Sequence, residues 1–121
     1  EHNDVVNRDQ LAGLAETVGA EHLKLLFGTL VDEAETAMEP LPEKPMRPED
    51  LRALQGRIHK LAGSAAMFGA SQLHGELADF ETALKEGRLS NLEQHHANAR
   101  ASWQTTRKEL TRSIDSIAAG S

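Results

Sequence analysis

Apolar residues recur every three or four positions along nearly the whole chain, and this spacing limits the fold more than any other feature of the sequence. It is typical of amphipathic helices, and no segment shows the period of two that a half-buried strand requires. Glycines at 19, 69 and 87, and a proline-rich break from Pro40 to Pro48, interrupt the pattern. The chain is therefore predicted to be all-α.

Five helical segments follow from these interruptions. The first is short, because Asn7 or Asp9 can cap its start and Gly19 ends it. The longer segments are predicted at about 20–39, about 48–68, from Ser71 as cap to Gly87, and about 89–118. Four long helices with short connections favour an antiparallel up-down-up-down four-helix bundle, with the short additional N-terminal helix packed across one end.

Composition excludes several classes of function. The formal net charge is −6 and the basic residues are scattered, which argues against a nucleic-acid partner or an anionic membrane surface. No apolar run approaches the ~20 residues of a membrane span, and no secretory signal pattern is present. The lack of cysteine removes disulfides and thiolate metal sites and fits a reducing compartment. A cytoplasmic protein is therefore expected.

The length of 121 residues is that of one domain, so residues 1–121 are expected to form a single helical-bundle domain. The sequence begins with Glu1 rather than Met. This start is compatible with a domain cut from a longer protein.

His59 lies off the apolar stripe of its predicted helix, at ~100° per residue, and should point outward. Three small residues, Gly56, Ala62 and Gly63, are predicted on the same outward face. A glycine inside a helix costs about 0.5–1 kcal/mol relative to alanine. We therefore expect these small residues to leave room for a large partner to approach the imidazole closely.

An exposed imidazole is largely neutral at pH 7 and can act as a nucleophile. However, no nucleophile elbow, triad signature or Walker loop accompanies His59. The ring could therefore receive a group only if a partner activates that group. Among the other histidines, His96 has the E-x-x-H spacing of di-iron bundles with Glu93, but such sites need two pairs and two further glutamates. No metal site is predicted.

The stretch His59-Lys60-Leu61-Ala62-Gly63-Ser64-Ala65-Ala66-Met67-Phe68-Gly69, followed by Leu73, resembles the signature of histidine-containing phosphotransfer (HPt) domains. That signature has glycine at the positions of Gly63 and Gly69 and leucine at the position of Leu73. The resemblance implies that His59 accepts a phosphoryl group at Nε2 from the aspartyl phosphate of a receiver domain and passes it to another receiver aspartate. It implies no cofactor, because the receiver brings the Mg²⁺.

One position departs from the family pattern. The family usually has a lysine three residues after the histidine, where this chain has Ala62. The candidates to support the phosphoryl group are therefore Lys60, directly after the histidine, and Lys85 on the next helix. Glu81 lies level with His59 if the two helices fold back at Gly69. The resemblance implies a hydrogen bond from this position to the other nitrogen of the ring.

The sequence leaves the cellular context and one rival function open. Response-regulator receiver domains are the implied partners, and the chain has no ATP-binding kinase motif of its own. It is either a free-standing phosphocarrier or part of a hybrid sensor histidine kinase, and its status as an enzyme is left open. The rival is a non-catalytic helical protein-interaction module, whose small-residue face accepts a partner helix without any chemistry at His59.

Overall fold

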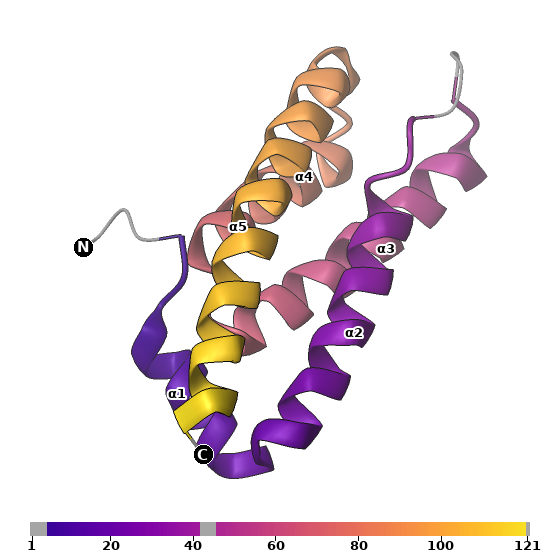
Figure 1. Cartoon of the computed structure of the whole chain (residues 1–121). Coiled ribbons are helices and arrows are strands. Elements are labelled where there is room, and N and C mark those ends of the chain that lie inside the picture. Colours follow the sequence, from indigo (N-terminus) through magenta and orange to yellow (C-terminus); the bar gives the residue numbers. More distant parts are fainter. Residues whose placement is uncertain (1–4, 42–45, 121) are drawn as a thin grey trace.

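The computed structural model describes residues 5–41 and 46–120, and all regular elements within these ranges are helical (Figure 1). The predicted all-α class is confirmed. The helices are α1 (Arg8–Val18), α2 (Ala20–Ala37), α3 (Pro48–Met67), α4 (Ser71–Lys85) and α5 (Leu92–Gly120), with a 3-10 turn, η1 (Leu89–Asn91), before α5.

Local sequence sets most of the helix ends. Asn7 is the N-cap of α1, and its side-chain oxygen accepts a hydrogen bond from the backbone N–H of Gln10 at 3.1 Å. Pro48 is the first residue of α3, where a missing N–H leaves no helical bond unmade. Two further prolines of the predicted break, Pro42 and Pro45, lie outside the described residues.

The prediction that Ser71 caps α4 is wrong. Ala70 occupies the cap position, and Ser71 is already the first helical residue. The Ser71 hydroxyl donates back to the carbonyl of Gly69 at 3.3 Å instead of accepting a bond from the helix. Gly69, with φ 72°, turns the chain so tightly that only Ala70 remains to connect it to α4.

The contacts between α2 and α3 show that these helices run antiparallel. Phe27, early in α2, lies 6.3 Å between ring centroids from Phe68 at the end of α3. Glu33, later in α2, accepts a hydrogen bond from Ser64, earlier in α3. Later residues of α2 thus contact earlier residues of α3. The N-terminal end of α2 therefore lies near the C-terminal end of α3.

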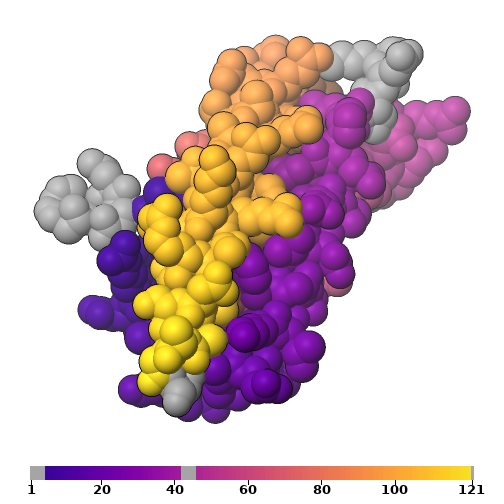
Figure 2. All heavy atoms as spheres, in the orientation of Figure 1, coloured from indigo at the N-terminus to yellow at the C-terminus, as the bar shows by residue number. Residues whose placement is uncertain are grey.

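The contacts between α4 and α5 follow the same rule. Ser102 donates to Gln72 near the start of α4, whereas the ring of His95 stacks on Phe80 near its end. Helix α5 also packs on α2, which closes the bundle, and the side chains of α2 and α5 meet along the face drawn in Figure 2. Each long helix thus contacts its neighbours in chain order.

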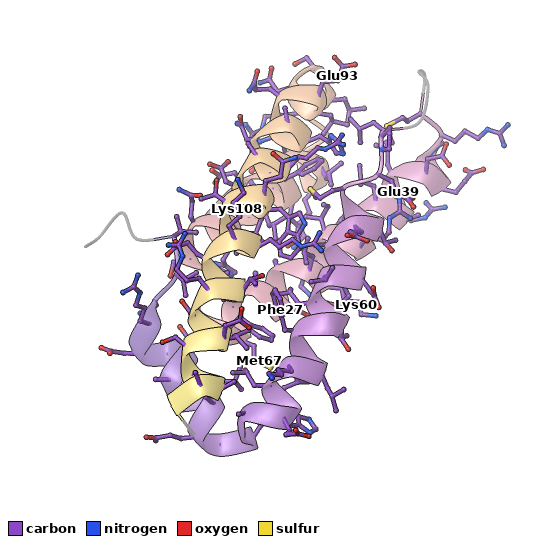
Figure 3. The ribbon with its side chains drawn as sticks, in the orientation of Figure 1. Phe27, Glu39, Lys60, Met67, Glu93 and Lys108 are labelled. Carbon is purple, nitrogen blue, oxygen red and sulfur yellow. The ribbon has the colours of Figure 1, made fainter. Side chains whose placement is uncertain are left out.

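The core is built mainly from aliphatic side chains, with the aromatic rings of Phe68, Phe80 and Trp103. Phe27 packs against its edge (Figure 3). The apolar seam predicted on α5 is buried as expected. Its buried members are Leu92, His96, Ala99, Trp103, Thr106, Leu110 and Ile114. Burying each leucine or phenylalanine side chain stabilises the folded state by about 1.5–3 kcal/mol relative to leaving it exposed. Among the residues described, no helix combines the length and the apolar character needed to cross a membrane.

The segment before α1 pins the turn between α3 and α4. The backbone N–H of Asn7 donates to the carbonyl of Gly69 at 2.7 Å, and the N–H of Gln72 donates to the carbonyl of Val5 at 3.4 Å. Helix α1 itself contacts α2, α3 and α5 near the lower end of the bundle in Figure 1. This arrangement fixes the C-terminal end of α3, two to three turns beyond His59.

Candidate functional site

His59 stands on the outer face of α3, two turns before the helix ends. Its side chain is 74% exposed, whereas Ile58 before it is fully buried and Leu61 after it is fully buried. Adjacent helical positions are ~100° apart, so burying the apolar stripe turns the imidazole to solvent. The sequence pattern that forms α3 therefore also presents its histidine.

Glu81, from α4, fixes one side of the ring. Its Oε2 is 2.8 Å from Nδ1 of His59, and its side chain is only 13% exposed. A carboxylate can only accept a hydrogen bond, so Nδ1 carries the hydrogen. In the neutral ring the lone pair is then on Nε2, which is the nitrogen directed away from Glu81.

Lys85 extends this contact along α4. Its Nζ is 3.4 Å from the same Oε2 of Glu81, one helical turn away. The three groups form a row of imidazole, carboxylate and ammonium. The ammonium balances the negative charge that Glu81 brings next to the ring, and its side chain is 59% exposed, so it is free to change rotamer.

A shallow groove beside His59 is shared by α3 and α4. Its lining residues are Arg52, Gln55, Gly56, His59, Glu81 and Lys85. Two of these carry positive charge, so an anion on Nε2 would have cations on both helices nearby. The structure therefore brings together four of the predicted site residues, namely His59, Gly56, Glu81 and Lys85.

The glycines of this face are not required by internal packing. A Cβ added at Gly56 or Gly63 would meet nothing within 4 Å in the folded chain. Both positions are exposed, so their open space faces outward. The same is true of other helical glycines, among them Gly13, Gly28 and Gly75, so open space is compatible with a docking partner but is not specific to this face.

Three predicted site residues do not line the groove: Gly63, whose open surroundings are described above, and two others. Ala62, expected on the outer face, is 7% exposed and belongs to the core. It lies ~60° round the helix from His59, on the flank that turns toward α4, and a side chain this short is covered there. Lys60 is exposed but turns the other way, with Nζ 3.8 Å from Oε2 of Glu33 on α2.

Glu33 and Ser64 are the site neighbours that the sequence did not indicate. Ser64 donates to Oε1 of Glu33 at 2.6 Å, beside the contact of Glu33 with Lys60. The four-residue spacing of Lys60 and Ser64 places both on one flank of α3, and this could have been predicted from the sequence. Which residue of α2 would meet them depends on the packing of two helices and has no local signal.

His96 has a structural partner. Its Nε2 is 2.9 Å from the backbone carbonyl oxygen of Glu39, and its side chain is 8% exposed. The ring also meets Phe80 edge-on, at 6.5 Å between centroids. Within residues 5–41 and 46–120, no three His, Asp or Glu side chains are grouped so that they could hold a metal ion.

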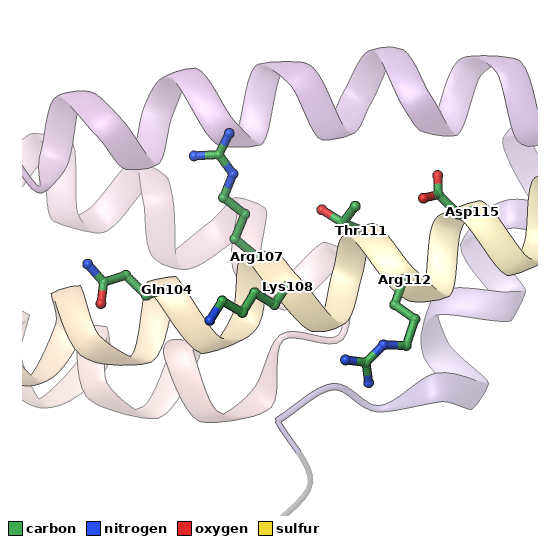
Figure 4. Close-up of a pocket in the computed structure, with 6 residues that line it drawn as sticks. All are labelled: Gln104, Arg107, Lys108, Thr111, Arg112 and Asp115. Carbon is green, nitrogen blue, oxygen red and sulfur yellow. The ribbon is translucent and has the colours of Figure 1, made fainter.

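Another hollow lies along α5, lined by Gln104, Arg107, Lys108, Thr111, Arg112 and Asp115 (Figure 4). Its arginines are engaged in ion pairs. Arg107 reaches toward α2, with Nη1 3.1 Å from Oε2 of Glu35, and Arg112 pairs with Glu109 at 2.8 Å. This hollow contains no imidazole, so the groove at His59 is the better candidate for group transfer.

The described residues form a class of helical bundle in which a carboxylate from one helix holds an exposed histidine of the preceding helix. Comparison with known families gives the same class: the Hpt domain pattern matches residues 26–120. The chain belongs to the Hpt domain family, the histidine-containing phosphotransfer domains.

Two curated relatives support this assignment. Both are named Phosphorelay protein LuxU, from Vibrio vulnificus strains YJ016 and CMCP6, and each is 30% identical to this chain over 84 residues. The aligned region covers 69% of this chain and 72% of each relative. No solved structure matches the chain significantly.

Proposed function

We propose that this chain is a phosphocarrier of a two-component phosphorelay and that His59 carries the phosphoryl group. The observation that carries the proposal is the hydrogen bond of 2.8 Å between Nδ1 of His59 and Glu81, which leaves Nε2 as the exposed nucleophile. Membership of the Hpt domain family and the phosphorelay name of the LuxU relatives support the same function.

The donor in this proposal is an aspartyl phosphate on a receiver domain. The lone pair of Nε2 attacks phosphorus, an N–P bond forms, and the bond from phosphorus to the aspartyl oxygen breaks, so that the carboxylate leaves with the electron pair. The ring keeps its hydrogen on Nδ1 and becomes positively charged, which the Glu81 carboxylate stabilises. A second receiver aspartate takes the group by the reverse sequence of bond changes. The receiver supplies the Mg²⁺ that neutralises the transferring group.

Lys85 and Arg52 are the residues that we assign to the phosphoryl oxygens. Both line the groove next to His59, and Lys85 is already placed beside the ring by its contact with Glu81. In this assignment Lys85, on α4, takes the place of the lysine that the family usually carries on the histidine's own helix at the position of Ala62. We assign Ala62 no contact with the phosphoryl group, because it is buried.

The receiver is proposed to dock over the outer face of α3. Gly56 and Gly63 lie one turn to either side of His59 and have open space around them. Met67, a further turn along α3, is 42% exposed and offers an apolar contact (Figure 3). Leu25 on α2 is the most exposed large apolar side chain among the described residues, at 71%. These side chains suit the apolar core of a transient interface.

The experiment is transfer of radiolabelled phosphate from receiver domains. A panel of purified receivers is phosphorylated with labelled acetyl phosphate and Mg²⁺ and is then mixed with the chain. We expect label on the chain that is stable in base and lost in acid, as for a phosphoramidate, and no label on His59→Gln. Label that persists on a folded His59→Gln variant would rule out His59 as the carrier.

The rival function, a helical protein-interaction module, shares the docking surface but needs no imidazole. It predicts that His59→Gln supports signalling in cells as well as the wild type does. A phosphocarrier predicts complete loss of signalling in that variant.

The cytoplasm as the site of exchange is part of the proposal and is tested by cell fractionation. Attachment to a hybrid sensor kinase is tested by sequencing the flanking gene.

A further inference from the structure

Lys60 follows His59 directly in α3, yet its side chain points toward α2, on the flank of the helix away from Glu81. Its Nζ is 3.8 Å from Oε2 of Glu33, and Figure 3 shows Lys60 beside α2. Neighbouring positions on a helix are ~100° apart, and this contact draws the ammonium further from the imidazole. The cation nearest to His59 in sequence is therefore engaged by α2.

Glu33 is held more firmly than the lysine that it binds. Its side chain is 18% exposed, compared with 73% for Lys60. Its Oε1 accepts the hydroxyl of Ser64 at 2.6 Å, and Ser64 lies one turn after Lys60 on the same flank of α3. This short hydrogen bond to a charged acceptor orients the carboxylate, so that the other oxygen faces Lys60.

The two flanks of His59 are thus built alike. On the α4 side, Glu81 lies 3.4 Å from the ammonium of Lys85. On the α2 side, Glu33 lies 3.8 Å from the ammonium of Lys60. Glu81 also binds the ring, whereas Glu33 contacts Lys60 and Ser64 within the described part of the chain. Any effect of Glu33 on His59 would therefore act through Lys60.

Building on the proposed phosphocarrier function, we propose that Glu33 is a positioning residue that competes with the phosphoryl group on His59 for the ammonium of Lys60. A phosphoryl group carries close to two negative charges and attracts an ammonium more strongly than one carboxylate does. Glu33 makes and breaks no covalent bond. By holding Lys60 on α2 it makes the phosphorylated state less stable, and so favours passing the group on to a receiver.

The test uses Glu33→Gln, which removes the charge but keeps an amide oxygen to accept the Ser64 hydroxyl. Each variant is equilibrated with one labelled receiver in Mg²⁺, and the ratio of label on the carrier to label on the receiver is measured. We expect the ratio to rise about twofold to fivefold, the range that an exposed ion pair allows. Glu35→Gln is the matched control, because it removes the same charge from α2 where the partner is Arg107 of α5. Its ratio should stay at the wild-type value.

The variant Lys60→Gln shows whether the effect passes through the ammonium. In that background, Glu33→Gln should no longer change the ratio. An equal rise with and without Lys60, or equal ratios for Glu33→Gln and Glu35→Gln, would overturn the role of Glu33. If thermal melting shows that Glu33→Gln does not fold, Lys60→Gln alone decides: a ratio no lower than wild type contradicts the proposal. Failure of the wild type itself to take label at His59 would instead contradict the phosphocarrier function.

Discussion

At the scale of single residues, the hydrogen bond from Nδ1 of His59 to Glu81 determines which ring nitrogen carries the hydrogen. The carboxylate accepts from Nδ1 at 2.8 Å and also lies 3.4 Å from the ammonium of Lys85. A carboxylate next to a phosphoryl group would repel it, but the ring that becomes positive on phosphorylation and the ammonium of Lys85 both lie in contact with this carboxylate. The same contact that selects Nε2 can therefore stabilise the positive ring that forms after attack.

Glu81→Gln separates these two effects. The amide oxygen still accepts the Nδ1 hydrogen, so the tautomer is kept, but the negative charge is lost. Without that charge the phosphorylated ring gives up its Nδ1 proton more readily and becomes a poorer leaving group. We expect the rate of transfer from His59 to a receiver to fall about threefold to tenfold, which matches the difference in strength between charged and neutral hydrogen bonds. Rapid-quench sampling measures this rate. Glu81→Ala, which also frees the ring, should be slower still.

Transfer by Glu81→Gln at the wild-type rate would show that the charge of Glu81 has no part in leaving-group activation. The role of the carboxylate would then be limited to orienting the ring, and only Glu81→Ala would slow the reaction.

Sequence reasoning at this scale succeeded where one helix is enough and failed where two helices meet. The outward direction of His59 follows from the stripe of α3 alone, and the contact with Glu81 follows from folding two helices back at Gly69. The burial of Ala62 depends on how closely α4 covers one flank of α3. The contact of Lys60 with Glu33 depends on the register between α2 and α3, which no local pattern contains.

At the scale of elements, the turn between α3 and α4 explains why a glycine stands at position 69. Gly69 has φ 72°, in the left-handed region, and a Cβ there would lie 2.8 Å from the carbonyl oxygen of Asn7. The sequence indicated the helix end at this residue. It did not indicate that the segment before α1 packs against the turn, because that contact joins residues far apart in the chain.

Gly69→Ala is expected to lower the free energy of unfolding by about 1–3 kcal/mol, from left-handed strain plus the clash with Asn7. Gly87→Ala is the matched control, because Gly87 has φ 71° and nothing within 4 Å of an added Cβ. That variant should lose only the strain, about 1–2 kcal/mol. Urea unfolding followed by circular dichroism measures both. Equal losses at the two positions would mean that the close approach of Asn7 has no energetic weight.

At the scale of the whole molecule, the bundle separates its stable and its functional parts. The core joins all five helices and uses the apolar stripe of every one, so the periodicity of the sequence was sufficient to predict the all-α class. The outer face of α3 contributes little to that core, and its glycines can vary without affecting internal packing. This face can therefore be altered without unfolding the protein, which allows docking to be tested separately from stability.

Gly63→Leu makes that test. A leucine there meets no atom of the chain within 4 Å of its Cβ and replaces a poor helix former, so stability should rise by about 0.5–1 kcal/mol. The side chain would nevertheless stand one turn from the ring, between His59 and a docking receiver. We expect the rate of labelling by a phosphorylated receiver to fall at least about tenfold, which corresponds to ~1.4 kcal/mol of lost transition-state binding.

The matched control for this variant is Gly75→Leu. Gly75 has the same open surroundings but lies on α4, ~120° round that helix from Glu81, so its leucine points away from the ring. That variant should be labelled by the receiver at the wild-type rate. Phosphoramidate, a donor too small to need a docking surface, should label His59 equally in both variants. Equal receiver rates for the two leucine variants would place the docking surface elsewhere on the bundle, whereas a loss of phosphoramidate labelling in Gly63→Leu would mean that the leucine covers the ring itself.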